Sequence, residues 1–413
     1  MDITPRHLVM VAAGKNNNKY YDMTPHGNTW TATYGRIGSG SQTREYPISQ
    51  FQSKYNEKIK KGYVDQTELV QDLITIEKPK KKSEYREIEN QVIAEIVERL
   101  QGMARKTIQE NYTVSSNKVT QAMVDAAQNI LDNLVTLDLA ANKEGGIQAF
   151  NDALIKLFTT IPRRMSDVHS YLAKNETDYA KIIDREQKLL DVMRGQVVQK
   201  QIVEDIADED DTKKNDKTIL ESLGLVIEEC TNEDIAKIRI ALGSCSDKFY
   251  KAWKVTNLKT QERFDKFVAE NNIKDTRLLF HGSRNENWWS ILQSGLVLRP
   301  TNAVITGKMF GYGLYYAPKA KKSLGYTSLS GSYWARGSSN CGFMGLLDVA
   351  YGKPYDVYSH TWDMGSLNYD KLQKICPGAN CLHAHAGQML YNDEIVVYKE
   401  EQCTIKYLVE LRN

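Results

Sequence analysis

Residues 278–292 read LLFHGSRNENWWSIL and raise the question of why a histidine and a glycine follow an apolar run. The apolar run is typical of a buried strand, and His281 and Gly282 stand where that strand would end. Glycine lets a neighbouring group approach the backbone closely, so the strand end is predicted to form the floor for a flat ligand. Trp288 and Trp289 open the next apolar-periodic segment and are predicted to pack within the protein.

Two later stretches have the same character, TGKMFGYGLYYAPKAKKSLGYT at 306–327 and YNDEIVVY at 391–398. Each places polar or ring-bearing residues beside small residues at the edge of a predicted strand. Tyr315 and Tyr316 are expected to face opposite sides of their strand, so that one of them packs in the interior. Glu394 directly precedes the apolar run IVVY and is expected at the mouth of that strand.

Taken in order, LLFHGS, TGKMFGYGLYYAPKAKKSLGY and NDEIVVY resemble the catalytic domain of the poly(ADP-ribose) polymerases. The spaced His–Tyr–Glu signature of that family falls on His281, Tyr315 and Glu394. A Ser-x-x-Tyr pair, Ser323 and Tyr326, and the closing KYLVEL strand extend the match. The resemblance implies an ADP-ribosyltransferase that uses NAD⁺ as its substrate, and it gives those first three residues the catalytic roles.

The resemblance also implies how the nicotinamide end of NAD⁺ is held. The main chain of Gly282 and the hydroxyl of Ser323 would bond the nicotinamide amide. Tyr315 and Tyr326 would sandwich the nicotinamide ring, an arrangement that favours a flat aromatic group.

The remaining implied contacts concern the two riboses. His281 would bond the adenine-side ribose, with Ser283 and Asn287 nearby, and Lys322 matches a basic family position close to the same site. Glu394 would bond the 2′-hydroxyl of the nicotinamide ribose, stabilise the oxocarbenium-like charge as the N-glycosidic bond breaks, and orient an acceptor hydroxyl. In the family this glutamate marks members that make polymer.

The chain as a whole is expected to be an α+β multidomain protein with three parts. Residues 1–78 have strand runs and then a helix, and they resemble a small mixed β/α WGR domain. Residues 84–205 show apolar residues at helical spacing and resemble the all-α helical regulatory bundle of the family. Residues 215–413 hold short strand runs between glycine-rich turns, typical of an antiparallel-sheet catalytic domain. Lys80–Lys82 lies in a predicted linker and could act as a nuclear import signal.

The N-terminal part predicts a nucleic-acid partner. Residues 1–83 carry 13 Lys and Arg against 8 Asp and Glu, whereas the whole chain has a net charge of only +2. The tripeptide after which the WGR domain is named is Tyr34-Gly35-Arg36 in this chain, with tyrosine in place of tryptophan. Arg36 is predicted to contact DNA or to signal between domains, and the alternative is that it serves the fold alone. The layout resembles the short DNA-activated members, which implies binding to DNA breaks, including 5′-phosphorylated ends.

Three departures from the family pattern concern regulation and substrate contacts. Val297 follows the glycine and leucine where the family often has arginine, and Ile395 stands where it has tyrosine. In IIDREQKLLDVM, Asp184 and Asp191 keep acidic positions of the helix that faces the NAD⁺ pocket in the family, but Gln187 replaces a frequent aspartate. Autoinhibition by this helix is therefore expected to be tuned differently.

Several classes of protein are excluded by the sequence. No apolar run is long enough to span a membrane, no secretory signal is recognisable, and the six scattered cysteines suit a reducing compartment. The expected location is the nucleus of a eukaryotic host, or the cytoplasm or nucleoid of a bacterium. Four side chains could hold zinc, Cys376, Cys381, His383 and His385, but their spacing matches no known zinc pattern, so no metal is predicted.

These features together predict a DNA-break-activated enzyme that transfers ADP-ribose from NAD⁺ to proteins, itself included, elongates poly(ADP-ribose) chains and acts in the DNA damage response. Two alternatives stay open. One is a mono-ADP-ribosyltransferase on the same fold. The other is a catalytically inert scaffold that binds DNA ends, against which the intact His281, Tyr315 and Glu394 argue.

Overall fold

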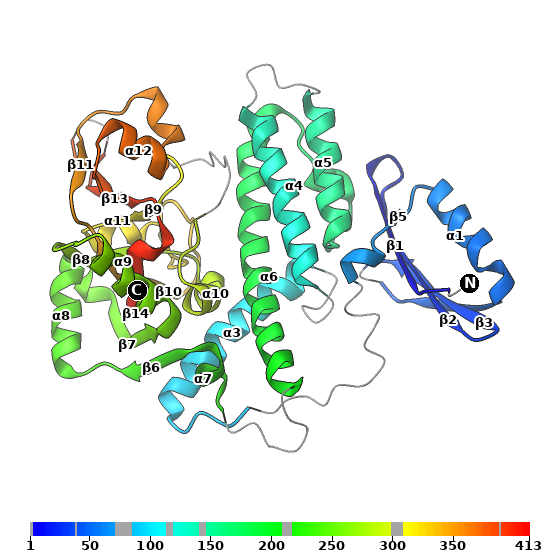
Figure 1. Ribbon diagram of the computed structural model, residues 1–413, viewed down its shortest axis with the longest axis horizontal. Coiled ribbons are helices and arrows are strands. Elements are labelled where there is room, and N and C mark those ends of the chain that lie inside the picture. Colours follow the sequence, from blue (N-terminus) through cyan, green and yellow to red (C-terminus); the bar gives the residue numbers. More distant parts are fainter. Residues whose placement is uncertain are drawn as a thin grey trace. The chain divides into compact units, whose positions relative to one another are not determined.

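The computed structural model describes residues 3–37, 39–70, 85–112, 119–139, 146–208, 217–298, 309–387 and 390–413. They form two compact units, one of residues up to 82 with 105–200, the other of residues 83–104 with 201–413 (Figure 1). The second is called the catalytic unit after the predicted catalytic domain within it. The predicted α+β class is confirmed. The predicted domain boundaries stay predictions, because their linkers, Lys80–Lys82 included, lie largely outside the described residues. Within the described chain, the model contains no helix with the length and apolar character of a membrane span.

The N-terminal sheet has five antiparallel strands in the order β4-β3-β2-β1-β5. Its elements are β1 (Arg6–Ala12), β2 (Asn17–His26), β3 (Thr29–Arg36), β4 (Gln42–Pro47), α1 (Phe51–Lys60) and β5 (Val64–Asp65). Helix α1 packs Phe51 edge-on against Trp30, with ring centroids 5.4 Å apart, at the centre of the core. The predicted strand runs and the helix after Pro47 are therefore confirmed.

Four long helices follow, as the helical spacing predicted. They are α3 (Gln91–Asn111), α4 (Gln121–Leu139), α5 (Gly146–Thr160) and α6 (Tyr179–Asp208). Phe150 of α5 stacks on Tyr179 of α6 with ring centroids 3.8 Å apart, and Gln128 of α4 bonds Gln187 of α6. Gln187, which was noted for replacing an aspartate, is thus buried inside this bundle.

Helix α3 belongs to both units, because the division falls after Ala104. Within the catalytic unit, both terminal nitrogens of Arg99 lie 2.9 Å from the carboxylate oxygens of Glu410, which is fully buried. Arg412 lies 2.9 Å from the same carboxylate. The first half of α3 is therefore tied to the catalytic unit by a buried ion pair, a division that the helical pattern of the sequence did not reveal.

The catalytic unit is built on two sheets, in the orders β6-β7-β14-β10-β8 and β11-β12-β13-β9. Their strands are β6 (Leu225–Glu229), β7 (Phe249–Asn257), β8 (Thr276–Gly282), β9 (Leu314–Tyr316), β10 (Cys341–Ala350), β11 (Pro354–Val357), β12 (Cys381–Ala384), β13 (Glu394–Val397) and β14 (Cys403–Arg412). All pairs are antiparallel except β11 with β12. The predicted antiparallel sheet is confirmed.

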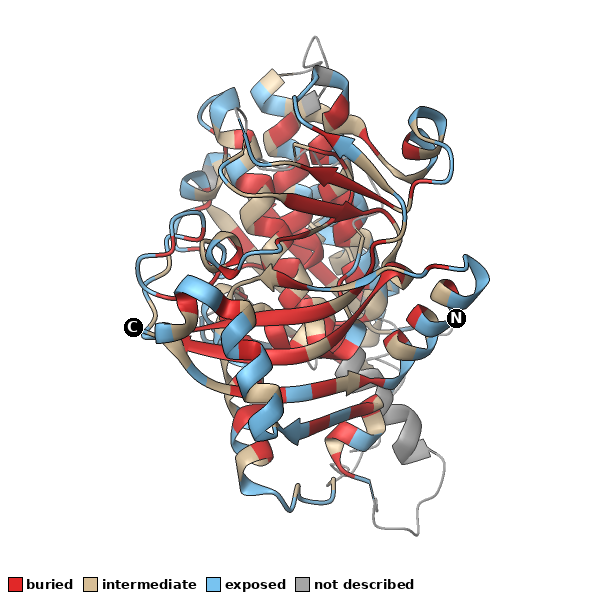
Figure 2. Ribbon diagram, turned by 90° about the vertical axis from the view of Figure 1, so that its left-hand side faces the viewer, coloured by how far each residue is buried: buried red, intermediate tan, exposed pale blue. Residues whose placement is uncertain are grey.

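Helices cover these sheets, and most of the central strand residues are buried (Figure 2). The helices are α7 (Ile219–Leu223), α8 (Asn232–Leu242), α9 (Leu258–Glu270), α10 (Trp288–Ser294), α11 (Ala320–Leu324) and α12 (Tyr369–Ile375). Trp288 and Trp289 are fully buried, as the prediction of a packing role requires. The two sheets meet where Phe280 and Ala317 exchange two backbone hydrogen bonds of 2.9 Å, and this junction positions the candidate site.

Candidate active site

The end of β8 brings His281 onto the neighbouring strand β9. Nδ1 of His281 lies 3.0 Å from the backbone oxygen of Tyr315, so the ring orientation is fixed by the main chain. Although some of its surface reaches solvent, surrounding protein desolvates the imidazole and lowers the pKa of His281. A neutral ring with Nδ1–H donating to the carbonyl keeps a lone pair on Nε2 for a ligand hydroxyl.

Gly282 answers the question posed by the opening stretch. A Cβ at this position would lie 2.0 Å from the backbone oxygen of Ser323 and 3.2 Å from Cβ of Tyr326. Since real side chains do not approach backbone oxygen so closely, only glycine permits β8 to run against α11. Here the requirement arises from close approach, not from an unusual backbone angle.

The surface at which β8 runs against α11 forms one wall of the candidate site. Helix α11 and the turn after it contribute a hydroxyl and an aromatic ring to this wall. The buried Ser323 donates from Oγ to the backbone oxygen of Phe280 over 3.1 Å. Tyr326 is 38% exposed, so its ring is accessible to a ligand. Desolvation, followed by the charge of Glu394, raises the pKa of Tyr326 to about 12, so the phenol stays neutral at physiological pH.

Glu394 and Lys322 form an ion pair at the start of β13. Lys322 Nζ lies 3.0 Å from Glu394 Oε1, and the two side chains are only 13% and 9% exposed. Burial raises the pKa of Glu394, and Lys322 opposes that rise by its charge and its hydrogen bond. Lys322 also donates to the backbone oxygen of Asn392 over 3.4 Å. The carboxylate is therefore held in a dry position with one cation beside it.

Tyr315 and Tyr316 face opposite sides of β9, as predicted. Tyr316 is 2% exposed and packs in the interior, whereas Tyr315 is half-buried. The Tyr315 hydroxyl donates to the backbone oxygen of Gly311 over 2.8 Å and accepts from the Phe310 N–H over 3.1 Å. Because its hydroxyl is already bonded, Tyr315 offers its ring to a ligand.

Ser283 and Asn287 lie just beyond the wall and contact each other. Asn287 Nδ2 donates to Ser283 Oγ over 3.0 Å, while the buried Asn287 Oδ1 has no hydrogen-bond partner in the described chain. An orphaned buried acceptor of this kind is suited to a ligand hydroxyl. The structure thus brings the predicted residues together around β8, β9, α11 and β13, with this pair at one side.

Asp393 was not singled out from the sequence. Its carboxylate accepts from the Ala386 N–H over 2.8 Å and lies 3.1 Å from Nε2 of His383, so it holds the chain immediately before Glu394. An acidic residue directly before the glutamate was the available signal. The four side chains considered for zinc, for which no metal was predicted, do not come together as a set: the group of metal-ligating type among the described residues is Asp356, His383 and His385, without Cys376 or Cys381.

Comparison with known proteins identifies the family in which this arrangement of residues is found. Residues 232–413 match the family model described as the poly(ADP-ribose) polymerase catalytic domain, and residues 4–70 match the WGR domain. A protein of Invertebrate iridescent virus 6, named "Putative poly [ADP-ribose] polymerase-like 100L", is 37% identical over 188 residues, 45% of this chain and 96% of that protein. The chain belongs to the poly(ADP-ribose) polymerase family.

Relatives from plants match smaller shares of their own length. Poly [ADP-ribose] polymerase 2 of Arabidopsis thaliana is 31% identical over 170 residues, 36% of this chain and 26% of that protein. Poly [ADP-ribose] polymerase 1 of Oryza sativa subsp. japonica is 26% identical over 313 residues, 69% of this chain and 30% of that protein. The chain is accordingly an ADP-ribosyltransferase with NAD⁺ as its substrate, and its WGR domain indicates a nucleic-acid partner.

The WGR domain of this chain carries a hollow of about 320 Å³. Its lining residues are Lys19, Tyr20, Tyr34, Gly35, Arg36, Gly40, Gln42 and Tyr63. Tyr34, the replacement for the family's tryptophan, stacks on Tyr21 with centroids 5.4 Å apart while it also lines the hollow. Basic and ring-bearing side chains in one hollow are suited to phosphate and sugar contacts.

Arg36 joins the WGR domain to the helical region of the same unit. Its Nη1 donates to the backbone oxygen of Asn16 over 2.8 Å, and its Nη2 donates to that of Ser166 over 3.0 Å. Asn16 Oδ1 accepts from the Val168 N–H over 3.0 Å, and Asn18 Nδ2 donates to the Arg163 backbone oxygen over 3.1 Å. These contacts place Arg36 between the WGR domain and the helical region of the same unit.

Proposed function

We propose that this polymerase is activated by DNA breaks, transfers ADP-ribose from NAD⁺ to protein side chains, itself included, and elongates poly(ADP-ribose) in the DNA damage response. It would act in the nucleus of a eukaryotic host, or in the cytoplasm or nucleoid of a bacterium. The observation that carries the polymerase part is the buried Glu394–Lys322 pair at 3.0 Å, within the same wall as Gly282 and Tyr326.

The wall around Gly282 would hold nicotinamide. The main chain of Gly282 would bond the carboxamide. Ser323 Oγ donates its proton to the backbone oxygen of Phe280, so its lone pairs are left to accept from the amide N–H of nicotinamide. Tyr326 and Tyr315 would flank the ring, and both phenols stay neutral because burial raises their pKa values. His281, with its Nε2 lone pair, would bond the adenine-side ribose beside Ser283 and Asn287.

Glu394 would then act on the nicotinamide ribose. Its carboxylate would accept from the 2′-hydroxyl and stabilise the oxocarbenium-like charge that develops at C1′ as nicotinamide leaves. The same carboxylate would accept a hydrogen bond from an acceptor hydroxyl and orient it for attack at C1′. Lys322 would keep Glu394 ionised in a buried position, which matters because burial alone favours the protonated form.

DNA activation would begin at the hollow in the WGR domain, through contacts with phosphates. Displacement of Arg36 would loosen its hydrogen bonds to Asn16 and Ser166, and with them the helical region. A local order-to-disorder change in the helices would open the NAD⁺ pocket. The free energy of DNA binding would thus drive the opening of the helical region, which would act as a gate to the NAD⁺ pocket.

The proposal is tested by incubating the purified chain with labelled NAD⁺, with and without nicked or broken DNA that carries 5′-phosphates, beside Glu394→Gln. A DNA-dependent smear that the variant loses supports a DNA-activated polymerase. A single sharp band without DNA dependence would replace it with the mono-transferase. No label on any protein would favour the inert scaffold.

The gate is tested separately with Asn16→Gly. Asn16 has a positive φ of 45°, which glycine adopts readily, so the variant removes the Oδ1 contact to Val168 without straining the backbone. We expect normal DNA affinity and an altered ratio of activity with DNA to activity without it. An unchanged ratio at unchanged DNA affinity argues against this route between the domains.

A deletion of residues 105–200 provides the complementary test. It keeps Arg99 on Glu410, which a deletion starting at 84 would remove. We expect activity without DNA. A deletion chain that stays silent without DNA but modifies itself when DNA is added would refute gating by the helices.

A further inference from the structure

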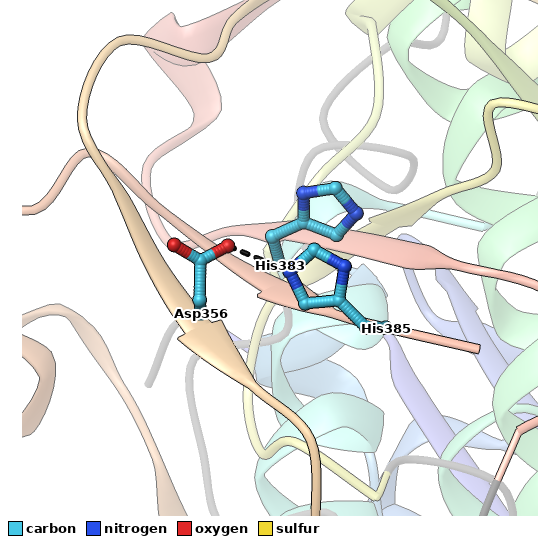
Figure 3. Close-up of side chains that lie close together, drawn as sticks. All are labelled: Asp356, His383 and His385. Atoms are coloured by element: carbon cyan, nitrogen blue, oxygen red, sulfur yellow. Dashed lines mark hydrogen bonds and ion pairs between the residues drawn. The ribbon is translucent and has the colours of Figure 1, made fainter. Parts of the chain in front are cut away.

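The second catalytic sheet carries a group of two histidines and a carboxylate that no step of the proposed reaction uses. Strands β11 and β12 run in parallel, and their register places Asp356 opposite His383. His385 follows β12, two residues further, on the same side of the chain. Nε2 of His385 lies 2.7 Å from Oδ1 of Asp356, and the two imidazole rings stack with centroids 4.0 Å apart (Figure 3).

The surroundings fix which nitrogen of His383 carries the lone pair. Its Nε2 lies 3.1 Å from Oδ2 of Asp393, and an ionised carboxylate can only accept, so this nitrogen bears the proton. Nδ1 of a neutral ring is then an acceptor, and it faces the hydroxyl of Tyr351 at 2.7 Å. A histidine that gives one N–H to a carboxylate and keeps the other nitrogen free of protons is the arrangement found at metal ligands.

We propose that Asp356, His383 and His385 bind a divalent transition-metal ion of the zinc type. The three ligand atoms all lie within 4.8 Å of one another. Zinc bonds to nitrogen and oxygen of about 2.0–2.2 Å place tetrahedral ligands about 3.4 Å apart, so the widest pair has to close by roughly 1.4 Å. The side chains that must turn are the most accessible ones, since Asp356 is 44% and His385 24% exposed. His383, at 10%, is the fixed member.

The donor set selects the class of ion. Two imidazoles with one carboxylate suit zinc and its neighbours in the transition series, whereas magnesium and calcium prefer oxygen ligands throughout. On binding, the ion would replace the proton now shared by His385 and Asp356, and a water or the Tyr351 hydroxyl would fill the remaining position.

The site is one strand away from the catalytic glutamate. Strand β12 pairs with β13 so that Ala384 stands opposite Glu394. Asp393, the carboxylate behind His383, is the residue before Glu394, and it also accepts from the Ala386 N–H. An ion held by β11 and β12 would therefore help to fix Asp393, the residue directly before Glu394, and its binding does not depend on the proposed DNA activation.

The test uses the full chain, freed of any affinity tag and stripped with a chelator. Zn²⁺ is titrated against a chromogenic chelator, and Co²⁺ is added separately to record its visible ligand-field bands. We expect one equivalent of Zn²⁺ and a Co²⁺ spectrum of low coordination number. Asp356→Asn and His385→Gln should each weaken binding by at least about tenfold, the scale of losing a metal-site group.

Two matched variants serve as controls. His26→Gln removes an exposed histidine of the other unit, and Cys376→Ser removes a member of the group suggested by the sequence. Neither should change the titration, and circular dichroism should show all four variants folded. Absence of a bound equivalent in the parent chain overturns the proposal. So does binding that survives both Asp356→Asn and His385→Gln, or binding that is lost in Cys376→Ser alone.

Discussion

Substitution of Gly282 by alanine tests the wall of the candidate site. The new Cβ would lie 2.0 Å from the Ser323 oxygen, whereas ordinary contact starts at 3.4 Å, so β8 and α11 must separate by the difference of 1.4 Å. Strain of this kind in a packed region costs about 1–3 kcal/mol of unfolding free energy. Displacement of a binding wall by about 1 Å costs roughly 100-fold in catalysis, so kcat/KM for NAD⁺ should fall on that scale while the fold survives.

The assay is nicotinamide release from NAD⁺, with kcat and KM measured separately, and urea unfolding of the same samples. Gly365→Ala is the matched control, because a Cβ there meets nothing within 4 Å and its backbone angle is ordinary. The control should keep both activity and stability. If Gly282→Ala retains kcat/KM within about twofold, the reasoning that ties this wall to the substrate is refuted.

Three further perturbations separate the roles of charged and hydroxyl groups. Lys322→Met should move the acid limb of the kcat/KM–pH profile to higher pH. Burial raises the pKa of Glu394 and Lys322 opposes that rise, so removal of the lysine raises this pKa further, and activity falls as the pH drops through it. Lys322→Arg keeps the positive charge and should leave the acid limb in place. In stability the sign is opposite: Glu394 favours the folded state most below its unfolded pKa of about 4.3, and this contribution is lost as the pH rises through the raised folded pKa. Tyr315→Phe should lower the unfolding free energy by about 1–3 kcal/mol, since it leaves the Phe310 N–H and the Gly311 oxygen unpaired, but should change KM little because the ring remains; an unchanged urea midpoint would contradict this. Arg99→Ala should lower the unfolding free energy by about 2 kcal/mol. This is less than the roughly 3–5 kcal/mol for a fully broken buried pair, because Arg412 stays beside Glu410. Lys266→Ala removes one member of an exposed pair and should leave the unfolding free energy unchanged in the same urea titration.

Local patterns were sufficient to predict several strands of the catalytic unit. The apolar run before His281 lies in β8, the apolar run after Glu394 lies in β13, and the alternation rule separated the buried Tyr316 from the half-buried Tyr315. Glu394 is the first residue of β13, as its position before an apolar run indicated. In these segments the hydrophobic period and the burial agree, so the sequence alone carries the information.

Contacts between distant segments could not be predicted in the same way. Asp356 meets His383 only because β11 pairs with β12 in parallel, and nothing local to either residue marks that pairing. The approach of Gly282 to Ser323 likewise depends on how β8 is set against α11. In the first helical segment, the spacing of Ile88, Val92, Ile96 and Leu100 predicts one apolar face; Ile96 and Leu100 are buried in α3 as predicted, but Ile88 precedes the helix, and Ile93 and Val97 are buried beside them.

The wall at Gly282 has a consequence for how binding there can change over time. Its surface includes main-chain atoms of β8 and α11, at a position where an additional carbon would lie 2.0 Å from the Ser323 oxygen. For a small carboxamide bound to these atoms as proposed, any side chain introduced at Gly282 would displace the wall and lower activity together with affinity. Escape from a competitive inhibitor of nicotinamide shape would therefore have to arise at the rings of Tyr315 or Tyr326, or at the ribose-facing groups. Substitutions that alter binding are therefore expected more readily at Tyr315, Tyr326 and the ribose-facing groups than at Gly282.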